Sequence, residues 1–237
     1  MKKILSVGDI HGKPVWKNID SSKYDLIIII GDLYDAFEYT ADEIHTNALE
    51  LVQWAKQSAN VKIIIGNHDA HYFKWQTPIF SKIRGAGFNE KQLHRAFHLY
   101  YDNQDLFQVA YQYGNYLWTH AGLSEISYNF HYKRKVEDIQ STFKEVNNLG
   151  KALNKLWDLN DLSLFIAPLS RGGNDSFGGP IWADRSDTIG GPLSGYHQIV
   201  GHSHCHDIIH KEINDETSIT YIDCLNFAIG KFYEINI

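Results

Sequence analysis

Three short apolar runs dominate the first 70 residues, and each ends in a glycine followed by an acid or an amide. The runs span residues 3–7, 25–30 and 61–65, and the second is an almost unbroken series of isoleucines. Runs that are this short, continuous and rich in β-branched residues are typical of buried strands in a parallel sheet. The chain is therefore expected to begin as an α/β protein.

A helix is expected between the second and third runs. Residues 42–58 place apolar side chains at helical spacing, and Thr40 followed by Glu43 forms a capping-box pattern at its start. Strand and helix thus alternate, and the polar residues fall at the carboxyl ends of the strands. In open α/β sheets, this is the edge at which ligands bind.

The remaining chain has a more mixed pattern. It predicts, in order, a hairpin at 107–121 turning at Gly114-Asn115, a helix at 134–156, a Gly/Pro-rich loop at 168–195, a strand at 198–201, and an antiparallel ribbon from 207–213, 218–223 and 228–235. No repeat or linker interrupts it. We therefore expect residues 1–237 to form a single domain, with 123–195 as a helical, glycine-rich cap insertion.

Charge and cysteine content narrow the functional classes. The 237 residues carry 22 Lys and Arg against 28 Asp and Glu, a net charge of −6, and the densest basic patch, 131–135, is short. A long nucleic acid is thus disfavoured as a partner. The apolar runs are too short for a signal peptide or a membrane span, and two cysteines, Cys205 and Cys224, make no disulfide framework. We expect a cytoplasmic protein without membrane contact, and the sequence identifies no protein partner.

The polar residues at strand ends form the main functional signal. They are Asp9, His11, Asp32, Asp35, Asn67, His68, His120, His202 and His204. Any one of them alone would more often be a helix cap, a turn residue or a structural histidine. Two Asp/His-x-His pairs together with two Gly-Asp or Gly-Asn turns favour a metal site instead.

The spacing of these residues suits two metal ions. If Asp9 and His11, and likewise His202 and His204, lie on strands, alternation puts each pair on one side, about 6.6 Å apart. Catalytic metal pairs lie roughly 3.5 to 4 Å apart, so each side chain of a pair can lean onto its own metal. Asp32 can bridge two cations, which an imidazole cannot. Nitrogen and oxygen ligands suit Mn, Fe, Zn, Ni or Co, and ligand type alone does not choose among them. Manganese is our first expectation.

The stretch VGHSHCHD at 200–207 contains a third histidine and a cysteine. His206 would lie roughly 13 Å along a strand from His202, too far to share its metal. Cys205 would point to the opposite face, into the core. The sequence therefore predicts two ligands here, not three.

These blocks resemble the signature of the calcineurin-like metallophosphoesterases. The matching segments, in the family's order, are Asp9-x-His11, Gly31-Asp32-x-x-Asp35, Gly66-Asn67-His68-Asp69, His120 and Gly201-His202-x-His204. The resemblance is strongest to bacterial and phage members of the phosphoprotein phosphatase branch. It implies a fold of two mixed β-sheets flanked by helices, a sandwich of four layers (α/β/β/α).

The resemblance also implies a role for each residue. One metal would be held by Asp9, His11, Asp32 and His204, and the second by Asp32, Asn67, His120 and His202. A hydroxide bridging the metals would attack phosphorus in line. His68 would protonate the leaving oxygen, and Asp35 would orient it and keep it cationic.

Some positions depart from the phosphoprotein phosphatase branch. Ala36 stands where that branch has arginine, which removes one expected phosphate clamp, and Asp69 stands where it has glutamate. Arg171 and Arg185, in the late Gly-rich loop, are candidates to grip phosphate oxygens. The alternative is that both are surface arginines.

Several aromatic residues follow the metal blocks and could line a substrate pocket. For most of them core packing is the favoured interpretation; they are Tyr34, Phe37, Tyr72, Phe73 and Trp75. We interpret His71 as a solvated loop histidine.

The leading hypothesis is a metal-dependent phosphatase that hydrolyses phosphomonoesters of a protein, a nucleotide or a small molecule. A phosphodiesterase, nuclease or dinucleoside polyphosphate hydrolase on the same metal core is the alternative. A scaffold without activity is disfavoured, because every expected ligand and His68 are present.

Overall fold

The three apolar runs form neighbouring parallel strands. They are β1 (Lys3–Val7), β2 (Leu26–Ile29) and β3 (Val61–Ile64), and Val7 pairs with Ile29 while Ile29 pairs with Ile63. The computed structural model describes residues 1–77 and 85–237. Contacts divide the chain into two units, unit 1 with residues 1–108 and 224–237 and unit 2 with residues 109–223.

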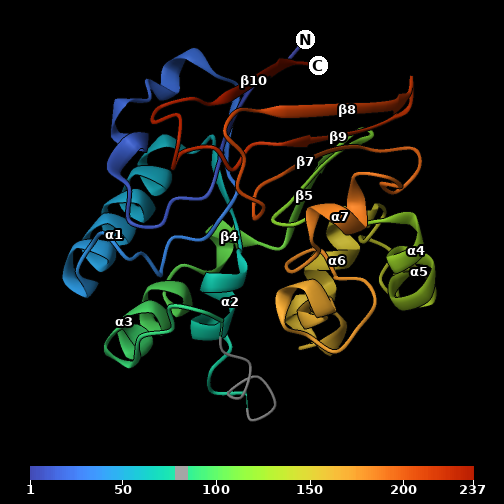
Figure 1. Ribbon diagram of the computed structural model, residues 1–237, viewed down its shortest axis with the longest axis horizontal. Coiled ribbons are helices and arrows are strands. Elements are labelled where there is room, and N and C mark those ends of the chain that lie inside the picture. Colours follow the sequence, from blue (N-terminus) through green and yellow to red (C-terminus); the bar gives the residue numbers. More distant parts are fainter. Residues whose placement is uncertain (78–84) are drawn as a thin grey trace. The chain divides into compact units, whose positions relative to one another are not determined.

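Unit 1 contains one five-stranded mixed sheet in the order β10-β1-β2-β3-β4 (Figure 1). The short strand β4 (Phe107–Gln108) continues the parallel set, whereas β10 (Tyr233–Asn236) runs antiparallel to β1. This pairing corrects the prediction that the third segment of the late ribbon stays with the other two. Because β10 pairs with β1, the two ends of the chain lie side by side in Figure 1.

The helices of unit 1 cover this sheet. α1 (Ala41–Ser58) has the predicted capping box, and Ile44, Ala48 and Leu51 are buried on its inner face. α1 contacts β3 and α3 (Glu90–Tyr101), while α2 (Asn67–Phe73) contacts α3. In the described part of unit 1, short 3₁₀ helices also lie at Pro14–Asn18, Ser21–Lys23 and Gln104–Leu106.

Unit 2 contains a second five-stranded mixed sheet in the order β5-β6-β7-β9-β8. The strands are β5 (Ala110–Tyr113), β6 (Tyr116–Thr119), β7 (His197–Val200), β8 (Ile209–Asn214) and β9 (Thr217–Tyr221). β6, β7 and β9 are parallel, and the two edge strands form antiparallel hairpins. Gly114, with φ of 59°, turns the first hairpin as the sequence predicts.

The helices of unit 2 lie between β6 and β7 in the chain. They are α4 (Glu125–Ser127), a π-helical turn (Tyr128–Tyr132), α5 (Lys133–Thr142), α6 (Leu149–Asp158), 3₁₀ turns at Leu162–Phe165 and Leu169–Arg171, and α7 (Arg185–Thr188). The predicted helix at 134–156 is two helices. Phe143 is extended, and the Asn148 side chain accepts from Lys151 N, so a new cap starts α6.

The central strand of each sheet is largely buried, and helices flank each sheet. The structure therefore confirms the predicted class, an α/β fold with two mixed sheets. Among the helices of the described chain, none is both long and apolar enough to cross a membrane.

Candidate metal centre

In unit 1, backbone hydrogen bonds join the loop after β1 to the loop after β2. Ile10 N donates to Gly31 O at 3.2 Å, and His11 N donates to Asp32 O at 2.6 Å. His11 and Asp32 both adopt left-handed backbone conformations, with φ of 42° and 49°. Such values are uncommon for residues other than glycine and often mark functional turns.

This geometry corrects the expectation that strand alternation orients the ligand pairs. β1 ends at Val7 and β7 ends at Val200, so the pairs lie in turns beyond the strands. His202, like His11, has a left-handed backbone, with φ of 62°. The turns therefore set the directions of these side chains.

Gly66 allows the loops after β2 and β3 to approach closely. A Cβ atom at Gly66 would lie 2.0 Å from Asp32 Oδ1 and 2.5 Å from Asp32 N. Any larger residue at this position would displace the carboxylate. Glycine at position 66 therefore leaves room for the Asp32 carboxylate.

Asp9, His11 and Asp32 form the candidate metal centre of unit 1. Each offers one ligand atom, and these atoms lie within 4.8 Å of one another. Asp9 and Asp32 are each 2% exposed, and burying two carboxylates this close is costly unless a cation compensates them. The donor set therefore fits a divalent metal.

The hydrogen bonds of His11 leave its Nε2 available to bind a metal. Its Nδ1 lies 2.9 Å from Tyr34 O and 2.7 Å from Asp35 O, and since a carbonyl only accepts, Nδ1 carries the proton. Nε2, 3.5 Å from Asp32 Oδ2, then presents its lone pair. A backbone carbonyl on the far nitrogen is the usual way in which a ligating histidine is oriented.

Electrostatics favour the same form of His11. Burial lowers the pKa of His11 below its usual value, and the nearby Asp32 carboxylate offsets only part of this. A lowered pKa keeps the imidazole neutral near pH 7. Metal binding requires this neutral form.

Asp69, the last residue of the third block, holds the loops together. Its carboxylate accepts from Leu33 N at 2.8 Å and from Gly66 N at 3.1 Å, and its side chain is buried. It thereby ties the loop after β2 to the start of α2. Nothing in the local sequence pattern indicates this role, because Leu33 lies 36 residues away.

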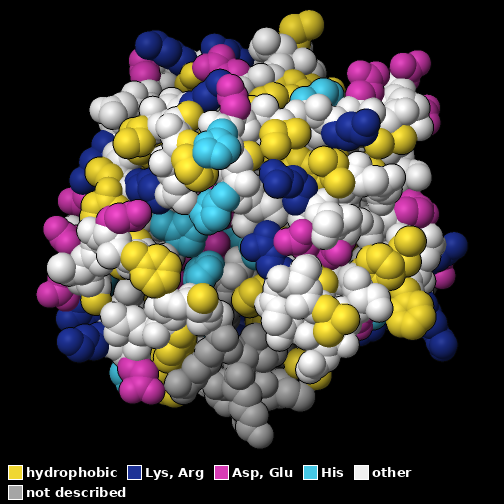
Figure 2. All heavy atoms as spheres, viewed as in Figure 1, with side chains coloured by type: hydrophobic (Ala, Val, Ile, Leu, Met, Phe, Trp, Pro, Cys, Tyr) yellow, Lys and Arg dark blue, Asp and Glu magenta, His cyan; other side chains and the backbone are white. Residues whose placement is uncertain are grey.

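His68 and Asp35 form an acid–base pair in unit 1. His68 Nδ1 donates to Asp35 Oδ2 at 3.0 Å, and the side chains are 20% and 1% exposed. Histidine side chains reach the surface on the face shown in Figure 2. Asp35 also has a left-handed backbone, with φ of 58°.

Two further side chains contact the Asp35 carboxylate. His71 Nε2 lies 3.0 Å from Oδ2, and the Tyr72 hydroxyl donates to Oδ1 at 2.5 Å. Burial by itself would raise the pKa of Asp35, but the contacts with His68, His71 and Tyr72 outweigh it and hold the pKa below its usual value. Asp35 is therefore a carboxylate at neutral pH.

The position of His71 corrects its interpretation as a solvated loop residue. It is on α2 and only 3% exposed. The signal that could have found it is its spacing, since position 71 follows His68 by nearly one helical turn. Of the aromatic residues after the metal blocks, Tyr34, Tyr72 and Phe73 are buried as predicted, whereas Phe37 is 91% exposed.

In unit 2, His120 and His202 lie together at the ends of neighbouring parallel strands. His120 follows β6, His202 follows β7, and Gly201 N donates to His120 O at 2.8 Å. Their ring centroids are 5.0 Å apart, and both side chains are buried. Two imidazoles this close at a strand edge can supply metal ligands.

His204 is oriented by an acid within the same unit. Its Nδ1 lies 3.0 Å from Asp223 Oδ2, and its side chain is 54% exposed while that of Asp223 is 2% exposed. As predicted, Cys205 is buried and His206 is exposed.

Arg171 lies beside the histidine turn of unit 2. Its Nε donates to Asp184 Oδ2 at 2.7 Å, and its Nη2 donates to Ser203 Oγ at 2.8 Å. Ser203 stands between the two histidines of the turn, so the guanidinium is held next to them. Arg185 is less closely held, with Nη1 at 3.5 Å from His204 O.

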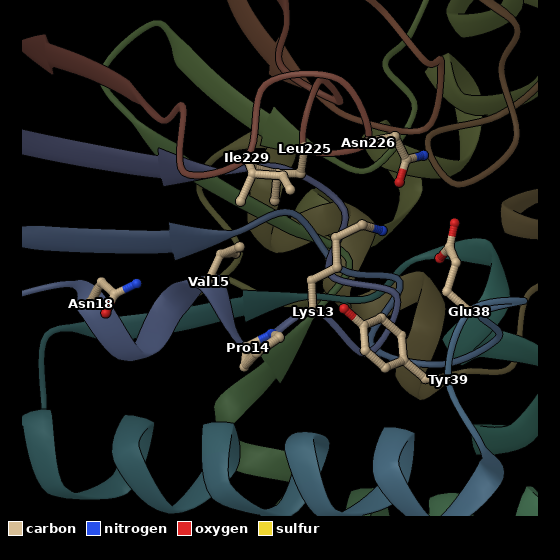
Figure 3. Close-up of a pocket in the computed structure, with 9 residues that line it drawn as sticks. All are labelled: Lys13, Pro14, Val15, Asn18, Glu38, Tyr39, Leu225, Asn226 and Ile229. Atoms are coloured by element: carbon tan, nitrogen blue, oxygen red, sulfur yellow. The ribbon is translucent and has the colours of Figure 1, made fainter.

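Unit 1 contains a cavity of about 370 Å³, lined in part by residues that follow the metal loops in the chain (Figure 3). Lys13, two residues after His11, and Tyr39, four residues after Asp35, line it together with Leu225 and Ile229. Apolar walls with a few charged and amide groups are typical of a pocket for a small organic ligand.

Comparison with known proteins identifies the class. The family model for calcineurin-like phosphoesterases matches residues 2–206. The chain therefore belongs to the calcineurin-like phosphoesterase family, and it is a hydrolase that acts on phosphate esters. Comparison with curated protein sequences finds no significant match.

Solved structures with a TM-score of 0.50 to this chain show the same fold. A cold-active protein-tyrosine phosphatase from a psychrophilic Shewanella species is 19% identical, with a TM-score of 0.50 over 98% of this chain and 73% of that one. A point mutant of a cold-active protein tyrosine phosphatase gives 18% identity, the same TM-score and the same coverage. A metallophosphoesterase from Sphaerobacter thermophilus is 13% identical, with a TM-score of 0.38 over 93% of this chain and 75% of that one.

Proposed function

We propose that the protein is a dinuclear metal-dependent phosphatase that hydrolyses phosphomonoesters. The observation that carries this proposal is the cluster of Asp9, His11 and Asp32, with both carboxylates buried, in a chain of the calcineurin-like phosphoesterase family. The two buried histidines of unit 2, His120 and His202, support it because they offer further imidazole nitrogens as metal ligands.

The proposed ligands form two sets that share Asp32. One metal would be held by Asp9, His11, Asp32 and His204, and the other by Asp32, Asn67, His120 and His202. Asp32 suits a shared position because His68 N already holds its Oδ1 at 2.9 Å, which fixes the plane of the carboxylate. The expected metal is manganese, with iron, zinc, nickel or cobalt as alternatives that the same donor set accepts.

When bound, the metals would supply an activated water and neutralise charge on the phosphate. The residues of the chain would do the rest. His68, next to Asn67 at the start of α2, would protonate the leaving oxygen, and Asp35 would keep its ring oriented through Nδ1.

Arg171 is the proposed phosphate-binding residue, and Arg185 is a second candidate. The hydrogen bonds from Arg171 to Asp184 and Ser203 hold its guanidinium in one orientation, which suits binding of phosphate oxygens. Arg185 is supported only by its longer contact with His204 O.

A small phosphorylated molecule is the preferred substrate among monoesters. The cavity lined by Lys13 and Tyr39 supports this preference, since its volume of about 370 Å³ lies at the lower end of the usual range for small-ligand sites. The proposed location is the cytoplasm, a preference supported by the thiols of Cys205 and Cys224, which are not joined in a disulfide.

A substrate panel tests the reaction type. The purified protein, loaded with manganese, is assayed on 4-nitrophenyl phosphate, bis(4-nitrophenyl) phosphate, a phosphopeptide and diadenosine tetraphosphate. We expect the monoester to be turned over fastest. Turnover of the diester alone would favour the phosphodiesterase or nuclease alternative, and preference for the dinucleotide would favour the polyphosphate hydrolase.

Metal analysis tests the centre itself. We expect two metals per chain, with Asp32→Ala losing both metal and activity. Asp25→Asn is the matched control, because Asp25 precedes the same strand at its opposite end and accepts from Lys3 N at 2.8 Å. A metal-free, inactive wild-type protein would favour the scaffold.

A further inference from the structure

The Asp35 carboxylate has more partners than an acid–base pair requires. His68 needs one oxygen, Oδ2, yet His71 approaches the same oxygen and Tyr72 donates to the other one. All three side chains come from one helix, α2. One short helix therefore supplies three contacts to a single buried carboxylate.

The hydrogen bonds of His71 show which nitrogen faces Asp35. Gly85 N donates to His71 Nδ1 at 3.2 Å, so Nδ1 presents a lone pair and the proton is on Nε2. Nε2 lies 3.0 Å from Asp35 Oδ2, close but out of line for a full hydrogen bond. The ring cannot turn away easily, because Tyr72 and Phe88 pack edge-on against it at 4.3 and 5.1 Å.

Tyr72 is held just as firmly. Its hydroxyl accepts from Asn89 N at 2.8 Å and donates to Asp35 Oδ1. Asn89 is the N-cap of α3, and Phe88 stacks on the Tyr72 ring at 5.2 Å. Burial and the neighbouring Asp35 carboxylate raise the pKa of Tyr72 well above its usual value, so the hydroxyl remains a donor.

We propose that His71 and Tyr72 are positioning residues that hold the Asp35 carboxylate so that His68 points its proton at the leaving oxygen. The inference rests on the proposed function, and it adds two residues to the acid–base pair. A carboxylate with one partner can rotate about its Cβ–Cγ bond. A partner on each oxygen fixes its plane, and the orientation of the His68 ring follows from that plane.

The role predicts a specific kinetic signature. Proton donation by His68 matters most when the leaving group is a poor one, such as an alkoxide, and little for 4-nitrophenolate, which leaves unprotonated. Loss of positioning should therefore slow the hydrolysis of an alkyl phosphate more than that of 4-nitrophenyl phosphate. Loss of general structure or of metal would slow both equally.

The experiment compares His71→Phe and Tyr72→Phe in the manganese-loaded protein. Both retain an aromatic ring, and Tyr72→Phe removes a single oxygen atom, so folding is preserved in at least one variant. The kcat for benzyl phosphate should fall about tenfold or more relative to that for 4-nitrophenyl phosphate, a part of the 10²- to 10⁴-fold that general acid catalysis contributes. His71→Gln, which retains a donor nitrogen, should recover much of the loss.

Tyr132→Phe is the matched control. Tyr132 is fully buried, and its hydroxyl donates to Ser163 O at 2.5 Å rather than to Asp35. Removing this hydroxyl should leave the ratio of the two substrates unchanged.

Equal loss on both substrates, loss of metal, or an unchanged ratio in the His71 and Tyr72 variants would overturn the proposal. These outcomes differ from failure of the proposed function. In that case the wild-type protein would hydrolyse neither ester, or His68→Ala would itself show no dependence on the leaving group.

Discussion

Two histidine–aspartate pairs, one in each unit, have the same separation and different surroundings. His68 Nδ1 and His204 Nδ1 each lie 3.0 Å from a buried aspartate oxygen, of Asp35 and Asp223 respectively. The first contact is a well-aligned hydrogen bond, whereas the second is out of line. Equal distances therefore do not imply equal roles.

The supports of the two aspartates explain the difference. Side chains of α2 contact both carboxylate oxygens of Asp35, and Tyr72 in turn is held by the start of α3. Asp223 is joined to the turn that carries His204, through Cys205 N donating to Asp223 O at 2.9 Å. The first arrangement suits a side chain that must keep one orientation, and the second suits a ligand that adjusts to a metal.

Replacing the two histidines should separate the two roles most clearly. His68→Ala should retain both proposed metals but lose about 10²- to 10⁴-fold in kcat on an alkyl phosphate, because it removes the proposed general acid. His204→Ala should lose metal, and its activity on every substrate should fall with it. Metal content by atomic emission and kcat on two esters check this; a His68→Ala protein without metal would mean that His68 is a ligand.

Replacing the two aspartates should separate the same two roles, metal binding and proton donation, with smaller effects. Asp223→Asn should weaken metal affinity by about 10- to 100-fold, the range for partners of ligating histidines, and excess metal should restore activity. Asp35→Asn should lower kcat in a way that added metal does not restore. Metal titrations followed by activity measure both, and recovery of Asp35→Asn by metal would remove the distinction.

Arg171→Ala extends the comparison to substrate binding in unit 2. Loss of a charge-assisted contact with phosphate costs roughly 1.5 to 3 kcal/mol, about 10- to 150-fold in kcat/KM. Lysine should not replace it, because the fork that bonds Asp184 and Ser203 would be lost. Steady-state kinetics of the Ala and Lys variants decide the point, and unchanged values would exclude Arg171 from the site.

Replacing Asp161 should have the smallest effect, because this carboxylate has no proposed role in the site. Lys135 Nζ contacts it at 2.6 Å; burial would raise the pKa of Asp161, but Lys135 and Ser163 hold it below its usual value. Its stabilising effect is present above the unfolded-state pKa of about 3.9 and is lost as the pH falls through the lower folded-state pKa. Asp161→Asn should thus cost about 0.5 kcal/mol at pH 7.

Urea denaturation at neutral pH and below the folded-state pKa measures this difference, which should vanish in the acidic range. Activity should be unchanged, in contrast to Asp35→Asn and Asp223→Asn. A loss that persists in acid would mean that packing, not charge, stabilises this contact.

Features with a local sequence signal were predictable. The strands β1 to β3, the capping box of α1 and the hairpin at Gly114 follow from periodicity and turn chemistry over a few residues. The break between α5 and α6 was missed because the cap at Asn148 lies inside a pattern that is apolar at helical spacing throughout. The two ligand pairs do not alternate as strand residues do, because their members lie two and four residues beyond the strand ends.

Partners that are distant in the chain were not predictable. β10 pairs with β1 across the whole length of the sequence, and Asp69 binds backbone groups of the loop after β2. His71 gives no sign in the sequence that its Nε2 faces Asp35, since this depends on where Gly85 and Tyr72 place it.

The sequence by itself determined the class of fold, the family and the residues that offer metal ligands, because strand-forming runs and ligand blocks are local patterns. Only the tertiary structure decided how those residues point. Left-handed turns at His11, Asp32 and His202 set the ligand directions, and contacts from α2 set the Asp35 carboxylate. Side-chain direction depends on backbone angles and on neighbours from elsewhere in the chain, and neither is written in the spacing of residues.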